Sequence, residues 1–441
     1  MSHWLPHYLL SHALSVAATL TSLVMLVRVF ASRRTPQSTF AWLLAIVFMP
    51  VVAIPLYLLL GSRKFPRKAK GGAGKLPPPR KGNTFELLPT GEAAYAVLME
   101  QIRGAQRSID LTIFILGSDA TGDAVVDALA ERASKGVSVR VILDAVGCTR
   151  SHRHATRVIG AAGGAVHTFM PLGHSPLRGR TNLRSHRKLI VFDGERVFAG
   201  GMNLANEYMG SAPDASRWRD VAAIVRGREL AADATALFES DWAFCGGEPR
   251  APTKVDVKTE EPAGDAIIQV VPSGPDMVTD TVYDALLTAI FGARERIVLV
   301  TPYYVPDDML QHALVLAARR GVRTEVVVPA RSNHRLTDMA RRAMLRELGA
   351  AGVRLHYYPK GMVHAKAMVT DDSFAYIGSP NFDMRSLFLN YENALFLLSP
   401  EPIGQVRAFI DGLIAESITE HPYEREHWVL EQLARLLAPE L

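Results

Sequence analysis

Two long apolar runs open the chain, and a much longer stretch of mixed character follows them. Residues 8–30 are apolar except for small polar residues, one His and one Arg, and residues 40–60 carry no charge. Each run is long enough to cross a hydrocarbon core of about 30 Å, so the pattern predicts a transmembrane helical hairpin over residues 1–62. Pro50 and Pro55 interrupt the second run, which leaves a kinked or re-entrant hairpin as an alternative.

Basic residues are concentrated after the second run. Lys and Arg recur between residues 63 and 81, whereas the connection between the runs carries only Arg33 and Arg34. Flanks rich in Lys and Arg stay in the cytoplasm, so we expect everything after residue 62 to be cytoplasmic. Anionic headgroups also attract basic segments, by about 1 kcal/mol per residue near the surface. The sequence therefore predicts a membrane and its anionic lipids as partners.

Beyond residue 85, helical patterns alternate with short β-branched strands, and this alternation occurs twice. Residues 135–142 correspond to residues 320–327, and residues 161–167 correspond to residues 350–356. Helices that alternate with apolar strands favour an α/β architecture, with helices over a mostly parallel sheet. The chain is therefore predicted to contain an internal duplication of one α/β unit.

The repeats divide the chain into segments. We predict one α/β domain at residues 86–250 and a second at residues 265–441, joined by a linker at residues 251–264. A segment rich in Lys, Gly and Pro, residues 63–85, reads as a second linker that connects the hairpin to the first domain.

Composition refines this picture only slightly. The 441 residues suffice for two or three domains, and the net charge of +5 is a mild surplus. The two cysteines, Cys148 and Cys245, form no disulfide framework and fit a reducing compartment. The sequence contains no CxxC motif or Cys/His cluster, so no metal site is expected.

The main chemical signal is a motif that occurs twice. His, Lys and Asp stand in the pattern H-x-K-x4-D, and a turn of small residues and an Asn follow in each copy. The first copy consists of His186, Lys188, Asp193 and Asn203, and the second of His364, Lys366, Asp371 and Asn381. Because all four residue types keep one constant offset between the copies, chance similarity of two strands does not explain the match.

This motif suits phosphodiester chemistry. Side chains alternate along a strand, so His and Lys two residues apart face the same way. If the two copies pack about a pseudo-twofold axis, two His, two Lys and two Asn converge on one point. Lys and Asn can then hold the non-bridging oxygens, while one imidazole attacks phosphorus and the other protonates the leaving oxygen. Such a step needs no metal or other cofactor when cations and donors stabilise the developing charge.

The duplicated motif resembles the signature of the phospholipase D superfamily, which is H-x-K-x4-D with GSxN. Within that superfamily, the whole chain is similar to the membrane-anchored bacterial cardiolipin synthases. The stretches that carry this similarity are residues 33–39, 207–208, 381–386, 390–392 and 434–439. The resemblance implies two duplicated phospholipase-D-type α/β domains with a pseudo-twofold active site between them, at the inner membrane of a bacterium.

The resemblance also implies an activity. Phosphatidyl transfer between two phosphatidylglycerol molecules would give cardiolipin and glycerol through a phosphohistidine intermediate. A hydrolytic phospholipase D, or a synthase that takes phosphatidylethanolamine as donor, remains open. A nuclease of the same superfamily is disfavoured by the hairpin, and no nucleic acid is expected as a partner. The oligomeric state stays undecided.

Roles for single residues follow from the same resemblance. His186 would be the nucleophile and His364 the general acid and later base, or the two roles would be exchanged. Phosphate would be bound by Lys188, Lys366, Asn203, Asn381 and Ser379. Gly201 stands where the family usually has the Ser that Ser379 keeps.

Four carboxylates complete the implied site. Asp220 and Glu392 would orient the catalytic imidazoles, Asp220 serving His186 and Glu392 serving His364. Asp193 and Asp371 belong to the catalytic motif itself, and a structural role is expected for their carboxylates.

Two further stretches allow more than one interpretation. The first copy has a longer loop, residues 168–185, which carries Arg178, Arg180 and Arg184. This loop is either a solvated surface loop or a rim that meets phosphate or an anionic membrane. His334 follows the end of a strand and either stays on the surface or reaches the rim of the pocket.

Overall fold

The computed structural model describes the following residues: 4–31, 36–60, 76–171, 183–250, 262–277, 279–419 and 431. Arg178 and Arg180, Arg33 and Arg34, most of both predicted linkers and the stretch at 434–439 lie outside these ranges. The chain forms two compact units, one with the N-terminal helices and one with a large sheet and its helices. Each unit is described by itself.

The N-terminal unit contains α1 (Trp4–Phe30), α2 (Pro36–Phe48) and α3 (Pro50–Leu60). The predicted single run at residues 40–60 is thus divided, because Pro50 lacks an N–H and starts a new helix. The resulting α2 and α3 have 13 and 11 residues, whereas a span needs about 20. No helix within the described residues is both long and apolar enough to cross a membrane. The predicted transmembrane hairpin is therefore not supported.

The second unit is built on a 14-stranded sheet to which two halves of the chain contribute seven strands each. The strands of the first half are β1 (Arg80–Leu88), β2 (Ser108–Ile113), β3 (Ser138–Asp144), β4 (Ala165–Phe169), β5 (Leu189–Phe192), β6 (Arg196–Gly200) and β7 (Ala222–Arg226). Those of the second half are β8 (Ala266–Ser273), β9 (Arg296–Val300), β11 (Arg323–Pro329), β12 (Arg354–Tyr358), β13 (Ala367–Thr370), β14 (Phe374–Gly378) and β16 (Glu392–Leu397).

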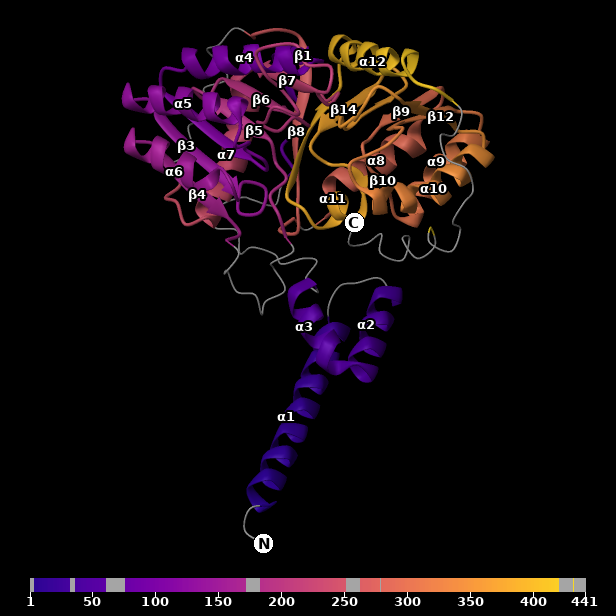
Figure 1. Cartoon of the computed structure of the whole chain (residues 1–441). Helices are drawn as coiled ribbons and strands as arrows, with labels where there is room; N and C mark the ends of the chain where they lie inside the picture. Colours follow the sequence, from indigo (N-terminus) through magenta and orange to yellow (C-terminus); the bar gives the residue numbers. More distant parts are fainter. Residues whose placement is uncertain are drawn as a thin grey trace. The chain divides into compact units, whose positions relative to one another are not determined.

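The order of the strands confirms the duplication. From the central pair outward, the first half reads β1-β7-β6-β5-β2-β3-β4 and the second reads β8-β16-β14-β13-β9-β11-β12. The two halves meet where β1 pairs antiparallel with β8, and Figure 1 shows them side by side around these strands. β1 begins at Arg80, inside the segment predicted as a linker, so that segment is shorter than expected.

The prediction of a mostly parallel sheet is wrong. Only β2-β3-β4 and β9-β11-β12 are parallel, and the other ladders of the sheet are antiparallel. Parallel neighbours need a crossover, which a helix supplies, whereas a tight turn joins antiparallel neighbours. Helices follow the early strands of each half, but tight turns at Asp193 and Asp371 join β5 to β6 and β13 to β14.

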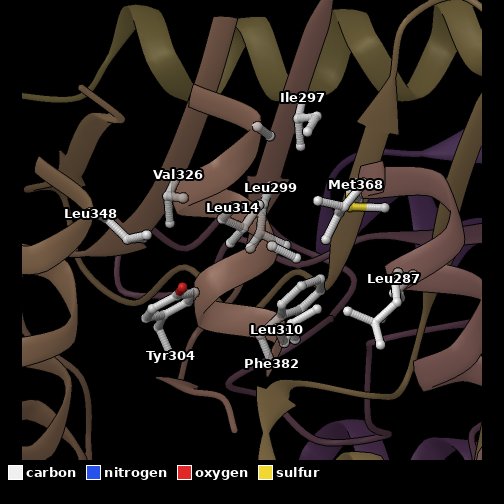
Figure 2. Close-up of a cluster of buried hydrophobic side chains, with 14 of the residues drawn as sticks. Leu287, Ile297, Leu299, Tyr304, Leu310, Leu314, Val326, Leu348, Met368 and Phe382 are labelled. Carbon is white, nitrogen blue, oxygen red and sulfur yellow. The ribbon is translucent and has the colours of Figure 1, made fainter. Parts of the chain in front are cut away.

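Helices cover both faces of the sheet. One face carries α4 (Gly91–Gly104), α5 (Ala120–Ser134) and α6 (His152–Ala161) in the first half, and α8 (Thr281–Gly292), α9 (Asp308–Arg319) and α10 (Arg335–Ala350) in the second. Figure 2 shows the second-half core on this face, where Leu299 and Val326 of the strands lie near Leu314 of α9. The other face carries α7 (Arg228–Phe244) and α12 (Pro400–Ala415).

A single hydrophobic core joins the two halves on that other face. It contains Phe85 and Val225 from the first half together with Val270 and Leu395 from the second. All four side chains are less than a tenth exposed. The two halves are therefore one packed body, and a site between them has a rigid frame. Three short elements complete the second half: β10 (Tyr304–Val305), β15 (Phe382–Asp383) and α11 (Met384–Phe388).

Candidate active site

Backbone hydrogen bonds between the halves position both motif histidines. Just before β5, the His186 N–H donates to the carbonyl of Tyr391 in the second half, at 2.8 Å. Just before β13, the His364 N–H donates to the carbonyl of Arg219 in the first half, at 2.7 Å. Each histidine therefore lies on a segment that pairs with the opposite half of the chain.

This exchange decides which carboxylate meets which imidazole. Nδ1 of His186 lies 3.0 Å from Oε2 of Glu392, and Nδ1 of His364 lies 2.6 Å from Oδ2 of Asp220. The predicted partners, Asp220 for His186 and Glu392 for His364, are therefore wrong. Glu392 directly follows the residue that bonds His186, and Asp220 directly follows the residue that bonds His364. Each imidazole is consequently oriented by a carboxylate of the other half.

The two motif lysines lie beside these imidazoles. The Lys188 ammonium donates to the carbonyl of His186 at 2.8 Å. The Lys366 ammonium lies against the His364 ring, 2.9 Å from Nε2. Burial lowers the pKa of Lys188 to about 8 and the pKa of Lys366 to about 7. Burial therefore disfavours the protonated form of both amines when no anion is bound.

The charges of the two copies also act on one another. Burial, with the charges of Lys366 and Lys188 and against the opposing effect of Asp220, lowers the pKa of His364 to about 3. The pKa of His186 is lowered by burial as well, with Glu392 opposing and both lysines adding to the effect. Each imidazole thus senses the lysine of the opposite motif, so the two copies form one electrostatic site. An anionic phosphate in that site would relieve the repulsion.

The carboxylates of this site remain ionised in spite of their burial. Burial raises the pKa of Asp220, but Lys366 and His364 hold it below the ordinary value of 3.8. Burial likewise acts against ionisation of Glu392, and His186 and Lys188 keep its pKa below 4.5. Each carboxylate can therefore stabilise a proton on the imidazole that it contacts.

One small residue of each Gly-rich turn lies against one of these carboxylates: Ser379 against Glu392 and Gly201 against Asp220. The Ser379 hydroxyl donates to Glu392, so it supports the His186 pair and is less available to a phosphate than predicted. A β-carbon at Gly201 would lie 2.3 Å from Oδ1 of Asp220. The shorter Asp220 therefore requires a glycine at the position where the longer Glu392 is held by a serine.

The two motif asparagines lie in the buried turns. Oδ1 of Asn203 accepts the Ile115 N–H at 3.2 Å, which leaves the Asn203 amide nitrogen as its donor group. Oδ1 of Asn381 is buried without a hydrogen-bond partner within the described residues. Both side chains are therefore held in buried positions, and Oδ1 of Asn381 retains unused capacity to accept a hydrogen bond.

Asp193 and Asp371 lie at the far ends of β5 and β13, away from the imidazoles. Both have a positive φ, 55° and 50°. The Asp193 carboxylate accepts the backbone N–H groups of residues 106, 107 and 108, and Asp371 accepts those of residues 294, 295 and 296. Each carboxylate therefore ties a tight turn to the start of a neighbouring strand.

Several contacts of the site were not predicted from the sequence. The rings of Tyr208 and Trp218 lie 5.0 Å and 5.3 Å from the His364 ring, and Phe114 lies 4.7 Å from His186. Tyr208 lies in a stretch that contributed to the family resemblance, so that stretch was a usable signal. Phe114 gave no signal, because an aromatic residue after a strand is common. No group of three or more His, Cys, Asp or Glu in the described ranges is arranged as a metal site.

The fold and the site define a class of protein. Two fused α/β repeats that place one H-x-K motif each at their interface are the arrangement of phospholipase D-like proteins. Residues 98–242 and 286–414 match the family described as cardiolipin synthase, PLD-like domain, and residues 18–62 match the phospholipase D-nuclease N-terminal family. The chain belongs to the cardiolipin synthase family of phospholipase D-like proteins, which confirms the resemblance seen in the sequence.

Relatives support this assignment over nearly the full length. The chain is 30% identical to the cardiolipin synthase of Halalkalibacterium halodurans, with 97% of this chain and 93% of the relative covered. It is 29% identical to the cardiolipin synthase of Alkalihalophilus pseudofirmus, with 94% and 88% covered. The phosphatidylserine synthase of Haemophilus influenzae shares the fold, with a TM-score of 0.62 at 16% identity over 81% of this chain and 95% of that one.

Proposed function

We propose that this protein is a phosphatidyltransferase that joins two phosphatidylglycerol molecules into cardiolipin and releases glycerol. The observation that carries the proposal is the pair of crossed imidazole–carboxylate contacts, His186 with Glu392 and His364 with Asp220. In both contacts the carboxylate engages Nδ1, so Nε2 is the ring atom that would face the substrate, and Lys366, now 2.9 Å from Nε2 of His364, would turn to the phosphate oxygens. Two such imidazoles in one cationic site can attack phosphorus and protonate a leaving oxygen.

The reaction would proceed in two steps. In the first, Nε2 of His186 forms a bond to phosphorus, the bond to the glycerol oxygen breaks, and His364 gives that oxygen its proton. In the second, a hydroxyl of another phosphatidylglycerol forms a bond to phosphorus, the phosphorus–nitrogen bond breaks, and His364 takes the hydroxyl proton. Lys188, Lys366 and the Asn203 amide would stabilise the charge on the non-bridging oxygens.

The N-terminal unit would attach the enzyme to the membrane. Its helices bury only a small core, which includes Met25, Ile46 and Tyr57. Many large apolar side chains of the unit are exposed instead: Val16, Leu20, Leu23, Val24, Val27, Phe30, Phe40, Leu44, Val47, Phe48, Met49, Val51, Val52 and Leu56. Such a surface gains stability by entering lipid. The basic residues that follow would favour the anionic cytoplasmic leaflet and its phosphatidylglycerol.

Product analysis tests the proposal. Purified full-length protein is given phosphatidylglycerol labelled in both glycerol groups, and the lipids are separated. We expect cardiolipin and free glycerol from the wild type, and neither from His186→Ala or His364→Ala. Phosphatidic acid as the only lipid product would identify a hydrolytic phospholipase D instead. Cardiolipin that requires added phosphatidylethanolamine would change the donor.

A further inference from the structure

Polar side chains connect the His364 imidazole with the protein surface. The Tyr303 ring lies 6.4 Å from the His364 ring, and its hydroxyl donates a 2.6 Å hydrogen bond to Oδ1 of Asn333. The same ring lies edge-on to His334, with centroids 5.3 Å apart. Asn333 and His334 are exposed. These residues therefore form an outer rim on the His364 side of the site.

The loop that carries this rim has a fixed shape. The Ser332 N–H donates to Oδ2 of Asp338 at 3.0 Å, and the His334 N–H donates to Oγ of Ser332 at 3.1 Å. No residue in the described part of the chain accepts a hydrogen bond from the Asn333 amide nitrogen. The rim therefore presents a positioned donor to molecules outside the protein.

The aromatic neighbour of His186 is apolar. This neighbour is Phe114, which has no hydroxyl and lies edge-on at 4.7 Å. The buried Cys148 thiol donates to the backbone carbonyl of Phe114 at 3.2 Å. The ring neighbours of the two histidines therefore differ in chemistry, because Tyr303 carries a hydroxyl and Phe114 does not.

We propose that Tyr303 and Asn333 bind the glycerol headgroup of the acceptor lipid beside the imidazole that takes its proton. This inference rests on the proposed function and deepens it. One hydroxyl of the glycerol attacks phosphorus, the bond from His186 to phosphorus breaks, and the proton passes to His364. The remaining hydroxyl hydrogen-bonds with Tyr303 and Asn333. Water has no second group to bind there, so these two side chains favour transfer over hydrolysis.

Two arginines adapt the same rim to an anionic acceptor. Arg331 and Arg335 flank Asn333 and His334 in the sequence, and both are exposed. A phosphatidylglycerol acceptor carries a phosphodiester next to its glycerol, and guanidinium groups bind such oxygens well. The rim thus combines donors for a polyol with cations for the adjoining phosphate.

The inference is tested by measuring how the phosphohistidine intermediate divides between transfer to phosphatidylglycerol and hydrolysis by water. Full-length Tyr303→Phe and Asn333→Ala enzymes are given labelled phosphatidylglycerol at several mole fractions in detergent micelles, and cardiolipin and phosphatidic acid are quantified. Both products arise from the same phosphohistidine, so loss of folded enzyme lowers both equally and leaves their ratio unchanged. We expect the ratio of cardiolipin to phosphatidic acid to fall roughly fivefold to tenfold, as for one lost hydrogen bond.

A second measurement separates the hydroxyl contacts from the charge contacts. The Arg331→Gln/Arg335→Gln double variant should lower transfer to phosphatidylglycerol but leave transfer to labelled free glycerol unchanged. Tyr303→Phe should lower both. Tyr283→Phe is the matched control, because it removes a hydroxyl that bonds Asp307 away from the site, and its ratio should equal that of the wild type.

The outcomes distinguish two failures. If Tyr303→Phe and Asn333→Ala both keep the wild-type ratio, the inference is overturned while the proposed function stands. If the wild-type enzyme makes no cardiolipin at all, the proposed function fails, and the acceptor site falls with it. That second failure is seen before any variant is tested.

Discussion

The crossed contacts make a prediction about where a trapped intermediate accumulates. Asp220→Asn replaces the carboxylate that contacts Nδ1 of His364 with a neutral amide of the same shape. The contact is 2.6 Å long, and His364 and Asp220 are only 4% and 1% exposed, so water cannot take over the role of the carboxylate. A charge-assisted hydrogen bond contributes about 1.5–3 kcal/mol, and the buried geometry favours the upper part of that range. Steps that need the His364 imidazole should slow by roughly 100-fold.

The assay uses a phosphatidyl donor whose leaving group is a nitrophenolate. The label is on the phosphorus of the phosphatidyl group. Such a leaving group needs no proton, so the attack of His186 proceeds while the second step, which needs His364 as base, is slowed. Asp220→Asn should therefore accumulate acid-labile phosphate, and peptide mapping should place it on His186. Glu392→Gln impairs the attacking imidazole itself and should accumulate little label.

The label should accumulate on the histidine that keeps its carboxylate partner even if the two histidines exchange roles. In that case Glu392→Gln would trap the label on His364, because the retained carboxylate still marks the attacking histidine. Asp233→Asn is the control, since that carboxylate binds Arg80 outside the site, and it should behave as the wild type. Label on His364 in the Asp220→Asn variant would refute the crossed arrangement, since that histidine would have attacked without its partner.

Three further outcomes follow from the same contacts. Arg187→Met leaves Asp241 buried without its cation, and it should lower the free energy of unfolding by about 3–5 kcal/mol in denaturant titrations; a loss below about 1 kcal/mol would contradict this. Asp193→Ala and Asp371→Ala should each lower that free energy by about 2 kcal/mol without changing the ratio of cardiolipin to phosphatidic acid, which product analysis checks. Burial lowers the pKa of Lys366 from 10.5 to about 7, so the unfolded chain binds more protons between these values and stability rises with pH. Lys188, whose pKa is lowered to about 8, adds to the rise above pH 8. Lys366→Met should therefore remove the rise between pH 7 and pH 8 and reduce it at higher pH, and an unaltered slope would exclude Lys366 as a source.

Local patterns in the sequence were enough to predict the repeated elements and which motif residues lie side by side. The period of two along a strand places Lys188 beside His186 and Lys366 beside His364, because that rule depends only on neighbouring residues. The same rule sends the residue between them to the opposite face, where Arg187 is fully buried. These features need no knowledge of distant contacts, which is why the sequence alone was sufficient.

Rules that depend only on neighbouring residues could not predict which carboxylate contacts which imidazole. Asp220 is nearer in sequence to His186, and Glu392 is nearer to His364, so proximity along the chain favours the wrong pairs. The correct pairs depend on two isolated bridges between the halves, Ser185 with Tyr391 and Arg219 with Val363. The excess of antiparallel ladders has a similar origin, since it depends on which strands are joined without a helix.

The two half-sites reach similar functional geometry with different supporting residues. Asp220 is short, and it approaches Gly201 so closely that a β-carbon there would lie 2.3 Å from its oxygen. Glu392 is one methylene longer, and the Ser379 hydroxyl donates to its carboxylate. The first half therefore combines a glycine with the shorter acid, Gly201 with Asp220. The second half combines a serine with the longer acid, Ser379 with Glu392. Because each acid then serves the histidine of the other half, neither half can form a complete imidazole–carboxylate pair by itself.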